Sequence, residues 1–372
     1  MPAVLAFIPG VGHFSHDRAV RGVGFLLAWF VALAIACSAR GEIVAAFTER
    51  GFDRKFATAF LALLVVGLPA LSAWDVRRLR GIAAAPKTGH GESQWKDVYR
   101  RFMRNRVART GLGLVLVLYC VAILAPFLAP YDPNAQENIV ETRYRAPSAE
   151  FPLGTDKFGR DILSRIIYGS RISLSIGFVA VGLAITLGTF LGAVAGYFGG
   201  KLDWIIMRFV DVMIAFPRLF IILTLIAIYS PEIWLIIAVL GATSWMGVAR
   251  LVRGQILSLK EQEFVQATRA LGIPAARTIF RHVLPNTMSP VIVAATLMIG
   301  DVILTEAALS FLGLGVQPPT ASWGNIVNQG RDNLIGAWWI ATFPGLAIVI
   351  TVVSYNLLGD GLRDALDPRL KN

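Results

Sequence analysis

Long apolar runs separated by short polar stretches dominate this chain. Residues 172–200 form an uncharged stretch of 29 residues, and residues 333–359 form another of 27. About 20 apolar residues suffice for a helix to cross the hydrocarbon core of a bilayer. Because the runs are continuously apolar and do not alternate with polar residues, they favour helices over a β-barrel. The pattern predicts an all-α polytopic membrane protein.

The same reading, extended over the whole chain, predicts eight spans. The fifth span is the least regular, because Arg208, Asp211 and Arg218 interrupt it. The predicted spans cover residues 20–39, 56–74, 107–129, 171–198, 203–230, 233–250, 286–312 and 336–358.

Composition and charge agree with a membrane protein. Of the 372 residues 55% are hydrophobic and 16% are charged, and the net charge is +11. Ordinary globular chains carry about 25% charged residues. A basic balance suggests either nucleic acid or a membrane flanked by positive loops, and the apolar runs decide for the membrane. The start of the chain lacks a basic region followed by a cleavable apolar segment, so no secretory signal peptide is predicted.

Lysine and arginine predict the orientation. Residues 77–109 carry ten of them and residues 250–281 carry six, whereas residues 313–336 carry only Arg331. The two basic segments are therefore expected in the cytoplasm. Eight crossings then place both termini in the cytoplasm, and parity places the loop 131–171 outside although it holds six basic residues.

The apolar runs and polar breaks also predict a division of the chain. Residues 1–75 read as a transmembrane hairpin, which either packs against the rest of the protein or binds an extra subunit. The remaining divisions are a polar cytoplasmic linker at 76–99, a first core helix with an outer loop at 100–170, the main membrane domain at 171–360 and a cytoplasmic tail at 361–372.

Motifs for catalysis and for metal binding are missing. The nearest approach to a phosphate-binding loop is Gly199-Gly200-Lys201, but Leu202 follows where Ser or Thr is required, so we read it as a turn at a membrane end. No serine elbow is present either. We therefore predict no enzyme site and no cofactor on this chain. The remaining candidate ligands are too scattered for a metal site or a disulfide framework: His13, His16, His90, His282, Cys37 and Cys120.

Two further patterns concern helix packing and helix ends. Gly188, Gly192, Gly196 and Gly200 are four residues apart, which puts them on one helix face where another backbone can approach closely. Residues 258–285, called the elbow below, predict two short helices at the membrane surface.

The elbow has start and stop signals at each predicted helix. Ser258 with Glu261 suggests a capping box, Gly272 a stop, Pro274 a new start and Pro285 an end before the next span. The first helix would carry a small apolar face of Ala267, Ala270 and Leu271, and positive charges at Arg269, Arg277 and Arg281 would suit an acidic partner. A solvated connector and a docking element both remain open on these grounds.

At the elbow the sequence resembles the permease subunits of ATP-binding-cassette importers. Their signature is Glu-Ala-Ala, then a glycine, then Leu-Pro; this chain has Gln266-Ala267-Thr268, then Gly272, then Leu284-Pro285. The spacing agrees, while Gln266 and Thr268 depart from the pattern, so a contact made by the family's acidic residue would be neutral here. The resemblance implies that the elbow, including Arg269, contacts an ATPase.

Further motifs are similar to the C-type subunit of the dipeptide, oligopeptide and nickel permease group. Those motifs fall within residues 100–372 and are Pro152–Asp156, Gly159–Asp161, Leu309–Gly315, Pro318–Thr320, Ser322–Gly324, Leu362–Asp364 and Asp367–Arg369. The resemblance implies a type I importer permease fold of six core helices, preceded here by the hairpin, in a bacterial cytoplasmic (inner) membrane. It implies as partners a homologous permease subunit, two cytoplasmic ATPase subunits that carry ATP and Mg, an extracytoplasmic substrate-binding protein and membrane lipid, with no nucleic acid.

The implied substrates are di- or oligopeptides, with nickel chelates, opines or other small solutes as alternatives. Asp301 and Glu306 lie inside the seventh span, about 140° apart around a helix, and need not share a face. An intramembrane acid is costly unless it faces water or a partner. Two readings stay open for them: a structural pair with an arginine or backbone donor at a gate, or direct contact with the substrate path.

The outer loop reads either as a solvated cap or, by the resemblance, as a docking region for the external binding protein. The residues implied for docking are Gly154, Thr155, Asp156, Gly159, Arg160 and Asp161. A second class of function also stays open: a secondary transporter or channel that uses Asp301 and Glu306 for protons or cations, for which broken helices and internal repeats are expected. Pro217 and Pro344 are the candidate kinks.

Overall fold

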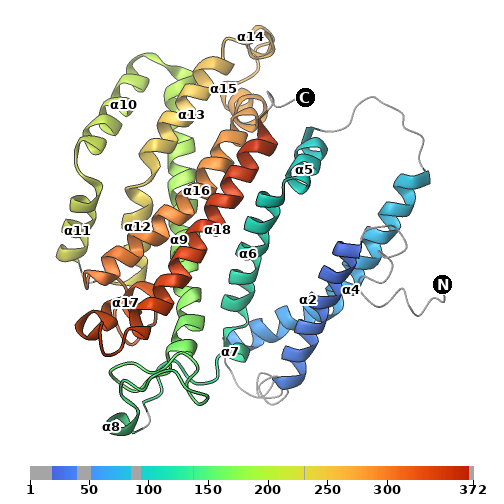
Figure 1. The fold of residues 1–372 in the computed structure, drawn as a ribbon. Coiled ribbons are helices and arrows are strands. Elements are labelled where there is room, and N and C mark those ends of the chain that lie inside the picture. The colour runs from blue at the N-terminus through green and yellow to red at the C-terminus, as the bar shows by residue number, and fades with distance from the viewer. Residues whose placement is uncertain (1–18, 40–51, 85–93, 137, 230, 368–372) are drawn as a thin grey trace. The chain divides into compact units, whose positions relative to one another are not determined.

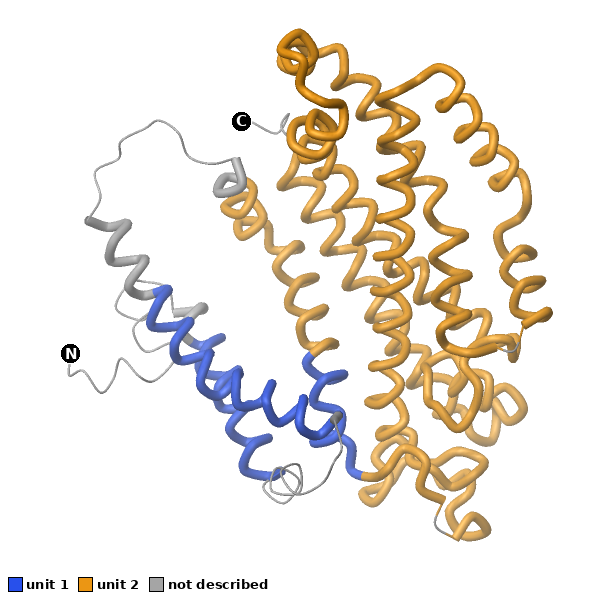
Figure 2. The backbone as a smooth tube through the Cα atoms, turned by 180° about the vertical axis from the view of Figure 1, so that it is seen from behind, with its two compact units in different colours: residues 1–92, 120–130 blue, residues 93–119, 131–372 orange. Residues whose placement is uncertain are grey.

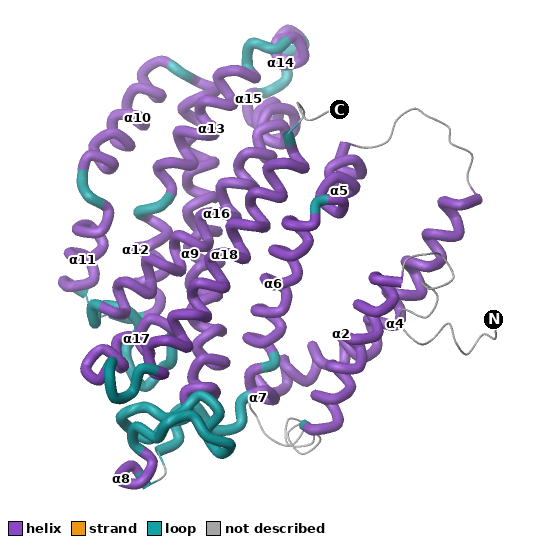
Figure 3. The backbone as a smooth tube through the Cα atoms, in the orientation of Figure 1, coloured by secondary structure: helices purple, strands orange, loops and turns teal. Residues whose placement is uncertain are grey.

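The protein is described by a computed structural model that covers residues 19–39, 52–84, 94–136, 138–229 and 231–367. The chain divides into two compact units (Figure 2). Unit 1 comprises residues 1–92 and 120–130, and unit 2 comprises residues 93–119 and 131–372. Within the described ranges the regular structure is helical, apart from one isolated bridge between Thr155 and Asp161 (Figure 3). The all-α prediction is confirmed.

Figure 1 shows the order of the helices along the chain. Their bounds are α2 Ala19–Ser38, α4 Phe52–Ala84, α5 Gln94–Arg104, α6 Arg106–Ile123, α7 Ala125–Leu128, α8 Ile139–Thr142, α9 Ile162–Phe198, α10 Gly200–Ala215, α11 Arg218–Ile228, α12 Ile233–Ala242, α13 Trp245–Leu259, α14 Glu263–Ala270, α15 Ala275–Thr278, a π-helical turn Ile279–Val283, α16 Leu284–Phe311, α17 Trp323–Gly330, a 3-10 turn Arg331–Asn333 and α18 Trp339–Leu366.

Six helices of the described chain are long and apolar enough to cross a membrane, and a bent pair makes a seventh candidate. The six are Asp53–Asp75, Arg106–Ile123, Ile162–Phe198, Ile233–Leu259, Ala275–Phe311 and Trp339–Leu366. The bent pair is α10 with α11, where the fifth span was predicted. The first predicted span corresponds to α2, whose apolar part, Val23–Ser38, is shorter than these helices. Helices therefore stand at all eight predicted positions, with a break inside the fifth and the shortest apolar stretch at α2.

The break in the fifth span has a local cause. Helices α10 and α11 meet at an angle of 84° across Phe216 and Pro217. Proline has no backbone N–H to donate and disfavours the helical region for the residue before it. Phe216 accordingly has φ −84° and ψ 134°, which is extended backbone. Proline thus ends α10, and α11 starts in a new direction.

Helix α9 packs closely against α13 through its glycines. A Cβ at Gly188 would lie 2.6 Å from the backbone oxygen of Trp245, and a Cβ at Gly192 would lie 2.5 Å from that of Ala249. Gly196 faces Arg253 in the same way at 3.0 Å, whereas a Cβ at Gly200 would meet nothing within 4 Å. The predicted glycine contact is confirmed for three of the four positions.

Unit 1 holds the N-terminal hairpin. The indole Nε1 of Trp29 in α2 donates a 2.9 Å hydrogen bond to the carbonyl of Val65 in α4. Ala32, Leu61 and Leu124 form a buried cluster, so the hairpin packs against the short helix α7 of the same unit. The two apolar helices therefore bury a shared face inside unit 1.

The predicted linker at 76–99 differs from the structure at both ends. Helix α4 continues to Ala84, and α5 already begins at Gln94. The residues between, 85–93, lie outside the described part, as do His13, His16 and His90. The polar composition of this stretch did not prevent helix formation, because Arg, Lys and Gln, which occur in its helical parts, are good helix formers.

Two opposite ends can be recognised in unit 2. The loop 131–161, with α8, and the helix α17 gather at one end, while α14 and α15 lie at the other, toward which α5 also lies (Figures 1 and 3). The basic residues of α5, Arg100, Arg101 and Arg104, thus lie toward the same end of unit 2 as the basic elbow, as their charge predicts. Which end faces the cytoplasm stays a prediction.

Candidate functional site

The first helix of the elbow begins later than predicted. Helix α13 runs through Ser258 to Leu259, and α14 begins at Glu263 with Gln262 in the cap position, without a side-chain capping bond. The predicted capping box of Ser258 and Glu261 is therefore wrong. Its pattern is local, whereas α13 is prolonged by buried apolar residues such as Ile256 that hold its last turns against the bundle.

The stop at Gly272 is confirmed. Gly272 has φ +69°, the left-handed region that glycine adopts without strain. Its N–H donates to the carbonyl of Arg269, and the N–H of Ile273 donates to that of Thr268, which together form a Schellman motif. Pro274 then stands in the cap position of α15. The elbow therefore contains two short helices joined by a rigid turn.

Pro285 does not end a helix. The chain from Ala275 to Phe311 is one helical span of 37 residues, with a π-helical turn at Ile279–Val283 just before Pro285. A wider turn relieves the clash between a proline ring and the carbonyl one turn earlier, so the proline is accommodated in the first turn of α16. The elbow is thereby connected without interruption to the middle of the membrane domain.

One side of the elbow packs on the bundle and the other is exposed. Val265 and Thr268 are buried, and Val265 packs in a cluster with Tyr197, Ile256 and Ile279. The Arg269 guanidinium lies 4.9 Å from the centre of the Tyr197 ring, a cation–π contact. Thr268 is therefore turned inward, so this departure from the family signature does not change the exposed surface.

The exposed side combines apolar and cationic groups. Leu271 is 78% exposed, and Phe264 and Phe280 are also exposed. The predicted small face of Ala267 and Ala270 lies on this open side too. The other elbow residues singled out from the sequence are exposed at Gln266, Arg269, Arg277, Arg281 and Pro285, while Leu284 is half-buried at the start of α16. An apolar tip flanked by arginines suits a partner groove with an acidic rim.

Three ion pairs join α10 and α11 to α13 and α16, and we call this line of six residues the charged seam. Arg253 Nη2 lies 2.7 Å from Asp203 Oδ2, and Arg253 Nε donates to Asp203 Oδ1, so the pair is bidentate. The other two contacts are Arg250 Nη2 to Asp211 Oδ1 at 2.6 Å and Arg218 Nη1 to Asp301 Oδ2 at 2.9 Å. Asp211 and Arg218, two of the three charged residues that interrupt the fifth predicted span, are thus in ion pairs.

The charged seam cannot face lipid. Asp301 lies ten residues before the end of α16, about 15 Å along the helix axis. Its side chain is 59% exposed and that of Arg218 is 32% exposed in the isolated chain. A charge at the centre of hydrocarbon costs about 2.5 kcal/mol or more. The seam therefore faces water or another protein.

Asp301 and Glu306 do not share a face, as their spacing predicts. Glu306 is fully buried; it accepts hydrogen bonds from Ser310 at 2.7 Å and from Ser173 at 3.4 Å. Ser173 in turn accepts from the N–H of Trp323 at the start of α17. Glu306 thus ties α9, α16 and α17 together, and only Asp301 of the two acids is open to a solute.

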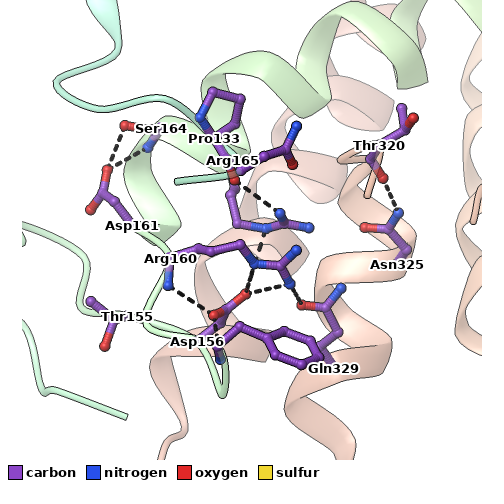
Figure 4. Close-up of polar contacts among 12 residues, drawn as sticks. Pro133, Thr155, Asp156, Arg160, Asp161, Ser164, Arg165, Thr320, Asn325 and Gln329 are labelled. Atoms are coloured by element: carbon purple, nitrogen blue, oxygen red, sulfur yellow. Dashed lines mark hydrogen bonds and ion pairs between the residues drawn. The ribbon is translucent and has the colours of Figure 1, made fainter. Parts of the chain in front are cut away.

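The outer-loop residues predicted for docking form an internal network (Figure 4). Asp156 accepts from Arg160 at 2.7 Å, and Arg160 donates to Gln329 of α17 at 3.0 Å. Arg165 donates to the carbonyl of Pro133 at 3.0 Å and lies 3.8 Å from Asp156. These contacts hold the loop to α9 and α17.

The rest of that set also has a structural place. Asp161 caps α9 by accepting from the N–H of Ser164 at 2.7 Å, and Thr155 is fully buried. Gly154 and Gly159 have φ +76° and +74°, which only glycine adopts easily. The side chains of Thr155, Asp156, Arg160 and Asp161 therefore shape the loop from within, while docking by its exposed surface stays a prediction.

Sequence reasoning missed several partners that only folding reveals. Arg218, Ser244, Arg165 and Gln329 were not singled out as site residues, although Arg218 had a signal as a charge inside an apolar run. Within the described residues no group of three or more His, Cys, Asp or Glu side chains is placed to hold a metal ion. Cys37 and Cys120 are free thiols. Gly199 and Gly200 form the left-handed turn between α9 and α10.

Comparison with known proteins gives consistent matches. Residues 188–372 match the family described as binding-protein-dependent transport system inner membrane component, and residues 93–147 match the N-terminal TM domain of oligopeptide transport permease C. Residues 1–92 lie outside both matches.

Individual relatives cover three quarters of the chain. The dipeptide transport system permease protein DppC of Bacillus subtilis is 41% identical over 280 residues, 75% of this chain and 87% of the relative. The oligopeptide transport system permease protein OppC of Haemophilus influenzae is 39% identical over 75% of this chain and 90% of the relative. The glutathione transport system permease protein GsiD of Pectobacterium atrosepticum is 42% identical over 75% and 92%.

Proposed function

Because this chain belongs to the family of binding-protein-dependent transport system inner membrane components, we propose that it is the permease subunit of an ATP-binding-cassette importer for di- or oligopeptides. The observation that carries the proposal is the 39–41% identity to dipeptide and oligopeptide permeases over 87–90% of their length. It is a multi-pass protein of a bacterial inner-membrane transporter and is not itself catalytic.

The elbow supports the proposed contact with a cytoplasmic ATPase. Its exposed tip, with Leu271 and Phe264 beside Arg269 and Arg277, has the apolar centre and charged rim that protein interfaces use. Gln266 is exposed and donates to the carbonyl of Glu261, so it can offer a neutral hydrogen bond where the family has an acid. Two ATPase subunits would engage this elbow and that of a homologous permease, and both termini would be cytoplasmic.

The continuous helix from Ala275 to Phe311 supports the proposed transmission of movement. The helical chain is unbroken from Ala275 to Phe311, so a displacement at Arg277 can be transmitted along it to the level of Asp301. ATP binding by the partners would draw the two elbows together and open the pathway outward, and hydrolysis would release it. Nucleotide chemistry would belong to the partners, which carry ATP and Mg.

The outer loop supports delivery by an extracytoplasmic binding protein. Its shape is held by the buried contacts of Asp156 and Arg160, while Phe158 and Lys157 are at least partly exposed on its surface. A loop that keeps one shape presents the same surface to an incoming receptor, which lowers the entropy cost of docking.

The test is reconstitution of the whole importer. The chain, a homologous permease, the ATPases and a receptor are placed together in proteoliposomes, and uptake of radiolabelled trialanine is measured with and without ATP. We expect uptake only with ATP, the receptor and an intact ATPase. Uptake without the ATPase subunits would refute the proposal in favour of a secondary transporter, a class in which broken spans such as α10–α11 are common.

A further inference from the structure

A cavity of about 290 Å³ lies at the bend between α10 and α11. The ion pair of Arg218 with Asp301 and the hydroxyl of Ser244 form its polar wall. We propose that this cavity is a transient binding site for the two charged ends of a short peptide, an inference that rests on the proposed function. Asp301 would hold the terminal ammonium, and Arg218 the terminal carboxylate.

The polar wall has spare hydrogen-bonding capacity. Arg218 uses Nη1 for Asp301 at 2.9 Å and Nη2 for Ser244 at 2.7 Å, while its Nε is buried without a hydrogen-bond partner within the described residues. Only Oδ2 of Asp301 takes part in the ion pair. When the contact with Asp301 loosens, a carboxylate can bind the Arg218 guanidinium through Nε and Nη1, and an ammonium can bind the Asp301 carboxylate. A buried donor without a partner is uncommon and favours a ligand at that position.

The charges of the cavity favour weak, reversible binding of a zwitterion, which is what a transport pathway needs. An empty site in which Arg218 and Asp301 neutralise each other carries no net charge, and a zwitterion adds none. Binding then exchanges one ion pair for two, so the gain is partly cancelled by the contact that is loosened. A pathway needs sites that are favourable enough to enter and weak enough to leave.

Flexible apolar side chains also line the cavity. Met213 of α10, Met246 of α13 and Met298 of α16 line the cavity from three helices. Methionine is unbranched and polarizable, and it adapts to irregular shapes at surfaces that bind varied partners. Fixed charges for the ends and adaptable thioethers for the side chains are what recognition of many different short peptides requires.

Size and position agree with this assignment. About 290 Å³ lies just below the usual range of ligand pockets, about 300–1,000 Å³, so the cavity has room for a peptide of two or three small residues at most. It lies at the bend of the broken span, on the seam that cannot face lipid.

A second ion pair supplies a matched control. Asp211 and Arg250 lie 2.6 Å apart on the same seam and are each 48% exposed, but neither lines the cavity. Loss of a charge at this pair changes the seam as much as loss of a charge at Arg218 or Asp301, without touching the proposed site. A general electrostatic effect would therefore appear in both pairs.

The experiment measures protection of a cysteine in the cavity. Met298→Cys is introduced into the complete importer in proteoliposomes without receptor, and its reaction rate with a maleimide is followed as trialanine is added. We expect protection by trialanine and much weaker protection by N-acetyl-trialanine amide. Asp301→Asn or Arg218→Gln should raise the half-protecting trialanine concentration about tenfold, the effect of losing one charge-assisted hydrogen bond. Asp211→Asn should leave it unchanged.

The outcomes separate this inference from the proposed function. Equal protection by free and capped peptides, or an unchanged half-protecting concentration in Asp301→Asn, would overturn the inference while ATP-driven uptake by the unaltered importer still stands. A change of kcat for uptake that is the same for free and capped peptides would show that the ion pair of Arg218 and Asp301 controls opening of the pathway and does not bind the peptide ends. That result would also overturn the inference. Failure of ATP-dependent uptake itself would refute the proposed function.

Discussion

The closest approach between α9 and α13 allows one prediction to be worked out in detail. A Cβ at Gly192 would lie 2.5 Å from the Ala249 backbone oxygen and 3.0 Å from the Val252 Cβ. Non-bonded heavy atoms prefer about 3.5–4.0 Å, so Gly192→Ala forces the helices apart by up to about 1 Å. Such overpacking costs about 1–3 kcal/mol, and the better helix propensity of alanine returns about 1 kcal/mol.

Gly182 provides the matched control on the same helix. A Cβ there would meet nothing within 4 Å, so Gly182→Ala gains the helix propensity without the clash. We expect the unfolding free energy of Gly192→Ala to fall below that of Gly182→Ala by about 2 kcal/mol, the middle of the overpacking range. The assay is unfolding of the detergent-purified chain by SDS, followed by far-UV circular dichroism. Equal stability of the two variants would show that α13 does not pack on these glycines as described.

Three further outcomes are expected. Asp156→Asn leaves the buried Arg160 and Arg165 without their counter-charge, so it should destabilise the outer loop by about 3–5 kcal/mol and increase its cleavage by trypsin. The control is Glu150→Gln, which removes a charge from an exposed ion pair and should change stability by less than about 1 kcal/mol. Leu271→Asp should weaken co-purification of the ATPase at least about tenfold, as expected for an interface hot spot. Ile335 is an exposed apolar residue at the other end of unit 2, so Ile335→Asp should leave co-purification unchanged. Gly272→Ala puts a Cβ at φ +69°, costs about 1–2 kcal/mol and should reduce uptake more than ATPase activity; equal losses of both would contradict the turn's role in coupling.

The spans could be predicted because hydropathy is a local property. Runs such as 172–200 are apolar whatever they pack against, and the structure has helices at each predicted position. The errors lie where a local pattern competes with packing. The capping box at Ser258 yielded to the buried face that prolongs α13, and Pro285 was accommodated by a π-helical turn.

The candidate site was predictable only in part. Asp301 stands out in the sequence as an acid inside an apolar run, but its partner Arg218 is 83 residues away and nothing local connects them. The charges of Asp156 and Arg160 resemble those of a solvated loop, yet both side chains are buried in one network with Gln329. Charge alone does not distinguish an exposed pair from a buried one.

Membrane insertion, the order of the helices and membership of the transporter family follow from the amino-acid sequence, because each depends on the composition of a run or on the spacing of a motif. The tertiary structure alone decides which charges pair, which of Asp301 and Glu306 is exposed, and where a cavity opens beside Pro217. These features depend on how helices distant in the chain pack against one another, and free energies of pairing and burial arise only from those long-range contacts.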